Sequence, residues 1–99
     1  MTERTREEID AMTWPVVLEF GASWCPYCKA IQRYIADSLA KHSSIQHIQI
    51  EDGKRKLLGR TFRVKLWPTQ VFMCDGQILH AAVGPSRSEI DQGFRLLVS

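Results

Sequence analysis

Residues 20–29 read Phe-Gly-Ala-Ser-Trp-Cys-Pro-Tyr-Cys-Lys, and the hydrophobic pattern changes period within this stretch. The residues that lead into it, Val16 to Phe20, form a β-branched and apolar run, interrupted by Glu19, that is typical of a strand buried on both faces. From Cys25 onward the apolar residues recur at steps of three and four, as on the core-facing side of a helix. The stretch therefore joins a buried strand to a helix that we predict over residues 25–41.

Apolar spacing also predicts three elements around this unit. A short amphipathic helix is expected over residues 2–12 and a strand over residues 45–50. A second, more charged helix is expected over residues 54–62, with Leu57 and Leu58 turned inward.

The last third of the chain reads as a hairpin followed by a helix. Strands are predicted over residues 69–74 and 77–83, because Asp75-Gly76 between them is a strong signal for a tight hairpin turn. Ser86 or Ser88 can cap the final helix. The residues of that helix expected to face the core are Ile90, Phe94, Leu97 and Val98.

This order of elements predicts one α/β domain. A strand, a crossover helix and a second strand imply a parallel pair, and the later hairpin adds antiparallel strands. The 99 residues leave room for a single domain over residues 1–99, with an N-terminal helix in 1–14 and a core in 15–99. We expect a four-stranded mixed sheet with helices on both faces.

Composition and charge narrow the functional class. The formal charge is only +2, and the basic run Lys54-Arg55-Lys56 closely follows Glu51 and Asp52, which indicates a solvated helix face and no nucleic-acid surface. No apolar run approaches the ~20 residues that a membrane-spanning helix needs. Residues 1–12 are polar and charged and lack the apolar core of a signal peptide. We therefore expect a cytoplasmic location, or a periplasmic one if a leader has been removed.

The spacing of Cys25 and Cys28 indicates disulfide exchange. Cys25 is predicted to lie at a helix N-terminus, where free N–H groups and the helix dipole favour a thiolate. Cys28 follows one turn later on the same face. Cys25 can then attack a substrate disulfide, and Cys28 can displace the reduced substrate.

Two other uses of the cysteines stay open on this reasoning. A zinc site could combine the pair with Cys74 and one of the three histidines, but no second close pair of ligands exists, so we expect no metal. Cys74 beside the hairpin turn is expected to be a small strand residue, with a regulatory thiol as the alternative.

Residues 20–29 resemble the active-site stretch of the thioredoxin superfamily, Phe-x-Ala-x-Trp-Cys-x-x-Cys-Lys. Trp67-Pro68-Thr69 is similar to the apolar-Pro-Thr turn of that family, and Asp75-Gly76 and Val83-Gly84 are similar to its hairpin and final glycine. The resemblance implies a thioredoxin-like fold and a monomeric thiol–disulfide oxidoreductase. It also implies protein disulfides and dithiols as substrates, and a reductase or another electron donor as partner.

The resemblance implies roles for individual residues as well. Pro68 corresponds to the family's cis-proline beside the cysteine pair, and Trp67 would flank the substrate groove, unless it is a core residue. Trp24 is expected to contact partners together with Pro26 and Tyr27. Glu19 stands where the family has a buried carboxyl that accepts the proton of the second cysteine, here Cys28. The alternative for Glu19 is a side chain that points to solvent at a strand edge.

The chain departs from thioredoxins in three ways. Pro26-Tyr27 between the cysteines is similar to glutaredoxins and predicts a centre more oxidising by roughly 40–70 mV. No strand precedes residue 16, and Gly21 stands where a Trp is common, which predicts a less filled loop. A glutathione-linked exchanger is therefore one alternative function, although Trp67-Pro68 and residues 83–85 lack the glutathione-binding pattern. Another alternative function is an iron–sulfur or other metal-binding module that uses Cys25.

Overall fold

The computed structural model describes residues 4–84 and 86–98. Their central feature is a sheet with the strand order β2-β1-β3-β4. β1 pairs in parallel with β2 and antiparallel with β3, and β3 pairs antiparallel with β4. The four-stranded mixed sheet confirms the predicted topology. The strands are β1 (Val16–Gly21), β2 (Gln46–Glu51), β3 (Thr69–Cys74) and β4 (Gln77–Val83).

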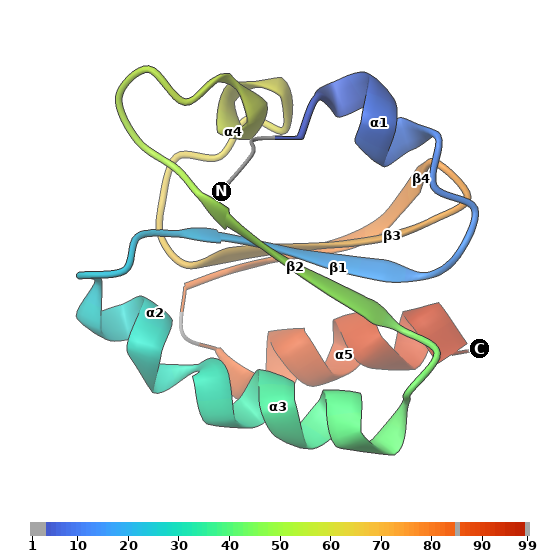
Figure 1. Ribbon diagram of the computed structural model, residues 1–99. Coiled ribbons are helices and arrows are strands. Elements are labelled where there is room, and N and C mark those ends of the chain that lie inside the picture. Colours follow the sequence, from blue (N-terminus) through green and yellow to red (C-terminus); the bar gives the residue numbers. More distant parts are fainter. Residues whose placement is uncertain (1–3, 85, 99) are drawn as a thin grey trace.

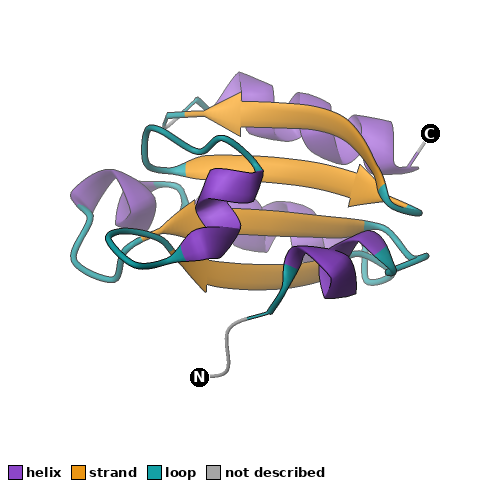
Figure 2. Cartoon of the chain, turned by 90° about the horizontal axis from the view of Figure 1, so that it is seen from above, coloured by secondary structure: helices purple, strands orange, loops and turns teal. Residues whose placement is uncertain are grey.

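Helices cover both faces of this sheet. In Figure 1, α1 (Arg6–Asp10) and α4 (Leu57–Thr61) lie on one face, and α2 (Pro26–Ala30), α3 (Gln32–Lys41) and α5 (Arg87–Val98) lie on the other. Figure 2 shows α1 and α4 lying across the strands. Alternate β1 side chains enter the two separate cores, so that Leu18 packs on the α1 and α4 side and Val17 on the α3 and α5 side. A central strand buried on both faces explains the apolar run before residue 21.

The continuous helix predicted over residues 25–41 is wrong in one respect, because it is interrupted at Ile31. This residue ends α2 and precedes α3, with φ −90° and ψ −7°. In an uninterrupted helix the Cys28 carbonyl would accept the backbone N–H of Gln32. It accepts the side-chain amide of Gln32 instead, at 3.0 Å. The break therefore occurs where a side chain replaces a backbone donor.

The helix predicted over residues 54–62 is also too long. Gly53 and Arg55 have positive φ angles of 140° and 68°, which no helix accommodates, and α4 begins only at Leu57. Leu58 is buried as predicted, but Leu57 is 64% exposed, so the inward orientation predicted for Leu57 is wrong.

The two ends of the chain follow the prediction in outline. The helix expected over residues 2–12 spans only Arg6–Asp10, and residues 2 and 3 lie outside the described residues. At the other end, the backbone N–H of Glu89 donates to Ser86 Oγ at 3.4 Å, which makes Ser86 the cap of α5. The core-facing prediction is confirmed for Ile90, Phe94 and Leu97, but Val98 is exposed.

The hairpin turn has the geometry that its sequence predicts. Asp75 and Gly76 both have positive φ angles, 54° and 75°, as in the type I′ turn that matches the twist of two-residue hairpins. The turn brings β4 back along β3. Directly after β4, the N–H of Gly84 donates to the Pro68 carbonyl at 2.8 Å. The hairpin thus ties the Pro68 turn to the end of the sheet where β1 leads into the cysteines.

Candidate active site

The two cysteines lie where β1 gives way to α2. Cys25 is the residue that caps α2, and its Sγ accepts the backbone N–H of Cys28 at 3.2 Å. Pro26 occupies the first turn, where its missing N–H costs nothing. Both thiols are free and buried. The strand–helix junction predicted from the sequence therefore brings Cys25 and Cys28 into direct contact.

The two thiols differ in acidity. Burial, the largest influence on Cys25, acts to raise its pKa, but hydrogen bonds from the Cys28 thiol and from the N–H groups of Cys28 and Tyr27 lower that pKa below its ordinary value of 9.0. Burial raises the pKa of Cys28 to about 11, assisted by its hydrogen bond to Cys25 and by the negative charges of Cys25 and Glu19. At neutral pH Cys25 is the better source of thiolate, and Cys28 holds its proton.

Gly21 at the end of β1 makes room for the Cys28 thiol. A Cβ atom added at Gly21 would lie 2.5 Å from Cys28 Sγ, far inside ordinary contact distance. The loop is therefore not underfilled as the sequence suggested, because the Cys28 thiol packs directly on the backbone of Gly21.

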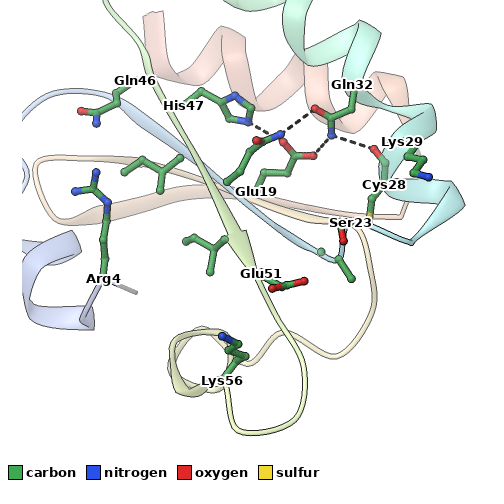
Figure 3. Close-up of a pocket in the computed structure, with 15 residues that line it drawn as sticks. Arg4, Glu19, Ser23, Cys28, Lys29, Gln32, Gln46, His47, Glu51 and Lys56 are labelled. Atoms are coloured by element: carbon green, nitrogen blue, oxygen red, sulfur yellow. Dashed lines mark hydrogen bonds and ion pairs between the residues drawn. The ribbon is translucent and has the colours of Figure 1, made fainter. Parts of the chain in front are cut away.

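Glu19 is buried in β1 and has two polar partners (Figure 3). Its side chain is only 5% exposed, so the alternative of a solvent-facing side chain at a strand edge is wrong. Oε1 lies 2.7 Å from Nε2 of His47, and Oε2 accepts the side-chain amide of Gln32. The same amide nitrogen donates to the Cys28 carbonyl at 3.0 Å, so Gln32 connects Glu19 to the backbone of the second cysteine.

Aromatic side chains surround the cysteines on their solvent side. Trp24 is 69% exposed and meets Trp67 edge-on, with ring centroids 5.5 Å apart. Trp67 is half-buried, packs against the cluster formed by Ala22, Cys25 and Cys28, and donates its Nε1–H to Asp52 at 2.9 Å. Tyr27 is exposed on the first turn of α2. An apolar surface therefore adjoins the thiols.

Pro68 follows Trp67 directly. The Trp67–Pro68 peptide bond is cis, the form that the resemblance implied, and Pro68 is fully buried. Thr69 Oγ1 donates to the Leu66 carbonyl at 2.6 Å and closes the turn. Trp67 thus comes from a loop more than 35 residues from the cysteines in sequence and still packs against their cluster.

Sequence reasoning did not identify Gln32 or Asp52 as residues of the site, and it considered His47 only as one of three histidines that could bind zinc. A crevice of about 880 Å³ runs beside β2, and Glu19, Cys28, Gln32 and His47 all line it (Figure 3). The one signal for His47 is a titratable residue that alternates with the apolar residues Ile48 and Ile50 in a predicted strand. For Gln32 and Asp52 we find no signal in the sequence.

The third cysteine lies apart from the pair. Cys74 ends β3, is half-buried, and packs against the core on the α3 and α5 side, as a small strand residue would. Within residues 4–84 and 86–98, no group of three or more His, Cys, Asp and Glu side chains could hold a metal ion. None of the described helices has the length and apolar character to cross a membrane.

Comparisons with known proteins agree with this geometry. The sequence model of the Thioredoxin family matches residues 2–95. Thioredoxin 2 from Pseudomonas aeruginosa PAO1, in its reduced form, superposes with a TM-score of 0.83 and 39% identity, over 97% of this chain and 90% of that one. Thioredoxin H5 from Arabidopsis thaliana is 32% identical over 77 residues, which are 78% of this chain and 65% of that protein.

A fungal protein gives a similar result, since Thioredoxin Asp f 28 from Aspergillus fumigatus is 30% identical over 79% of this chain and 73% of its own length. The chain spans just under two thirds of the length of the plant thioredoxins that it matches, 65% and 64% for Thioredoxin H5 and Thioredoxin H3 of Arabidopsis thaliana. The family match nevertheless extends over almost the whole chain and includes both cysteines and the Pro68 turn. This chain belongs to the thioredoxin family.

Proposed function

We propose that the chain is a thiol–disulfide oxidoreductase that exchanges disulfides with protein substrates through Cys25 and Cys28. The observation that carries this proposal is the unequal acidity of two thiols in contact, with the pKa of Cys25 lowered and that of Cys28 raised to about 11. Disulfide exchange needs one thiol that is ionised before substrate arrives and a second that becomes a nucleophile only afterwards.

The reaction follows in two steps that conserve electrons. The Cys25 thiolate attacks one sulfur of a substrate disulfide, which forms a mixed disulfide and releases the other sulfur as a thiolate. Cys28 then loses its proton and attacks Cys25 Sγ. This second step forms the Cys25–Cys28 disulfide and releases the second substrate thiolate, so the substrate gains the two electrons that the cysteine pair loses. A reductase or another donor returns two electrons to the pair.

Glu19 is the proposed proton acceptor for Cys28, through an intervening water. Its carboxylate is buried beneath the α2–α3 junction, and Gln32 links it to the Cys28 carbonyl. A thiol with a pKa of about 11 has little thiolate at neutral pH, so the second step needs a nearby base.

The surface around Cys25 suits a protein substrate. Exposed Trp24 and Tyr27 and the half-buried Trp67 offer apolar contacts, and exposed Pro26 lies beside them. Pro68 is buried and supports the turn that carries Trp67. We expect the protein to act as a monomer in a reducing compartment such as the cytoplasm. Because Pro26-Tyr27 lies between the two cysteines, we still expect a reduction potential above that of typical thioredoxins.

Reduction of insulin disulfides with dithiothreitol as reductant tests the proposal. Cys25→Ser should abolish the activity, and Cys28→Ser should accumulate a mixed disulfide on Cys25 that mass spectrometry detects. Cys74→Ser is the matched control and should retain full activity. Activity that survives Cys25→Ser would refute the proposal. If the reduction of a glutathione mixed disulfide were much faster than that of insulin, the glutathione-linked alternative would replace protein substrates.

A further inference from the structure

Glu19 has a single titratable hydrogen-bond partner among the described residues, His47. The two side chains meet at 2.7 Å, between Oε1 of Glu19 and Nε2 of His47. Glu19 is 5% exposed, but the His47 side chain is 21% exposed because β2 is an outer strand of the sheet. His47 therefore touches the buried carboxylate with one part of its ring and reaches solvent with another.

We propose that His47 is a positioning residue that carries protons between buried Glu19 and solvent during disulfide exchange. The proposal rests on the role of Glu19 as proton acceptor for Cys28. A base enclosed by protein can act in repeated turnovers only if it returns each proton to water. The crevice beside β2, which both Glu19 and His47 line, provides that exit (Figure 3).

A second hydrogen bond holds the proton route in one orientation. Gln49, two residues after His47 on β2, donates its side-chain amide to Oε1 of Gln32 at 3.2 Å. The amide nitrogen of Gln32 consequently points toward Glu19 and the Cys28 carbonyl. Gln32 can only donate there, so it fixes the carboxylate without accepting its proton. The proton leaves on the Oε1 side, toward His47.

The transfer balances with one tautomer of the imidazole. When Nδ1 carries the proton, the lone pair on Nε2 can accept the proton that Glu19 has taken from Cys28. The imidazolium then releases the proton on Nδ1 to water, and Glu19 is a carboxylate again. The net change is the loss of one proton from Cys28 to solvent. Glu19 is restored, and His47 is neutral again as the Nε2–H tautomer, which exchange of its ring protons with water converts back to the Nδ1–H form before the next turnover.

Few other charges face His47. From α3 the neighbouring side chains are Gln32, Ile35, Ala36 and Leu39, which carry no charge. Cys28 and Lys29 of α2 and Glu51 of β2 line the same crevice. Its remaining charged residues are Arg4, two residues before α1, and Lys56, directly before α4, and both helices lie on the opposite face of the sheet. The imidazole of His47 is therefore the titratable group in contact with Glu19 through which the proton can leave.

The test separates the two sulfur steps in a single reaction. The reduced protein is mixed with limiting dithiobis(nitrobenzoate): attack by Cys25 releases the first thionitrobenzoate, and attack by Cys28 releases the second. His47→Gln keeps a side chain that can donate to Glu19 but cannot titrate. We expect the second phase to slow by about tenfold at neutral pH and to lose the inflection that the wild-type pH profile owes to an imidazole, while the first phase is unchanged.

His80→Gln is the matched control, because His80 lies on β4 at the opposite edge of the sheet, faces Glu89 at 3.0 Å and has no part in the route. Its two phases should match those of the wild type. A second-phase pH profile in His47→Gln that equals the wild-type profile would overturn the proposal. If Glu19→Gln changes that profile and His47→Gln does not, the role of Glu19 stands and that of His47 falls. An absent first phase in wild type would instead refute the oxidoreductase function.

A measurement on the wild-type protein tests the proposal even if the His47→Gln variant misfolds. The ionisation of the His47 ring can be followed by NMR in the wild-type reduced protein. The proposal requires its midpoint to coincide with the inflection of the second phase. Two midpoints that differ would refute the proton route, even if His47→Gln is unstable.

Discussion

Replacing Glu19 by Gln tests the proton-acceptor role by the sign of the rate change. The negative charge of Glu19 helps to hold the pKa of Cys28 at about 11, so its removal lowers that pKa. If the charge were the only influence, Cys28 would carry more thiolate in Glu19→Gln and would attack faster. If Glu19 accepts the proton, the same substitution removes the base and slows the attack. The two roles predict opposite results.

The structure also sets the size of both effects. With a pKa of about 11, roughly one Cys28 in ten thousand is ionised at pH 7, against about one in a hundred at the ordinary value of 9.0. A complete return to 9.0 would raise the thiolate fraction by about 100-fold, but the less basic thiolate is a poorer nucleophile, which leaves a gain of about tenfold at most. Loss of a positioned base costs about 100-fold or more. The alternatives therefore differ by about three orders of magnitude.

The second release of thionitrobenzoate measures this step directly. We expect Glu19→Gln to slow it by about 100-fold at pH 7, and to make it rise about tenfold per pH unit up to the lowered pKa of Cys28, because hydroxide then replaces the base. Glu89→Gln, which removes the carboxylate facing His80, is the control and should behave as wild type. A faster second phase in Glu19→Gln would show that Glu19 acts only through its charge, and would refute the proton-acceptor role.

Two further predictions concern stability. Gln70 is completely buried in β3, and both of its amide atoms lack a hydrogen-bond partner among the described residues. Gln70→Leu should therefore raise the free energy of unfolding, measured in urea titrations, by about 1–2 kcal/mol. A decrease would mean that the amide has a partner such as bound water. A Cβ at Gly93 of α5 would lie 2.3 Å from the Phe72 ring. Gly93→Ala should therefore lower the free energy of unfolding by about 1–3 kcal/mol, while the folded protein still releases thionitrobenzoate in both phases. An unchanged melting temperature would contradict the close packing of α5 on β3.

The properties of Cys25 could be predicted from sequence because they are local. A cysteine before a helix meets backbone N–H groups within the next three residues, wherever the rest of the chain lies. The hairpin turn is local in the same sense, since Asp75-Gly76 alone determines the turn type. The mixed character of the sheet also followed, because a crossover helix implies a parallel pair and a tight turn implies an antiparallel one.

The partners of Glu19 could not be predicted in this way. His47 reaches Glu19 only because β1 and β2 pair with Val17 opposite His47, and a shift of one residue would turn His47 to the other face. The contact of Gln32 with Glu19 could not be predicted for a different reason, because a polar residue on a predicted helix normally faces solvent. Its side chain instead donates to the Cys28 carbonyl, at the point where the helix is interrupted. Sequence periodicity carries no information about such a contact.

The outer position of β2 has a consequence for solubility. In the described part of the chain this strand has a neighbour on one side only, so its other edge presents unpaired N–H and C=O groups to which a strand of another molecule could add. Gln46, His47, Gln49 and Glu51 make this edge polar and resist that addition. His47, which contacts the buried carboxylate of Glu19, is thus also one of the polar residues that oppose aggregation at this edge. Engineering that replaces it with an apolar residue risks intermolecular sheet growth together with any change in redox rate.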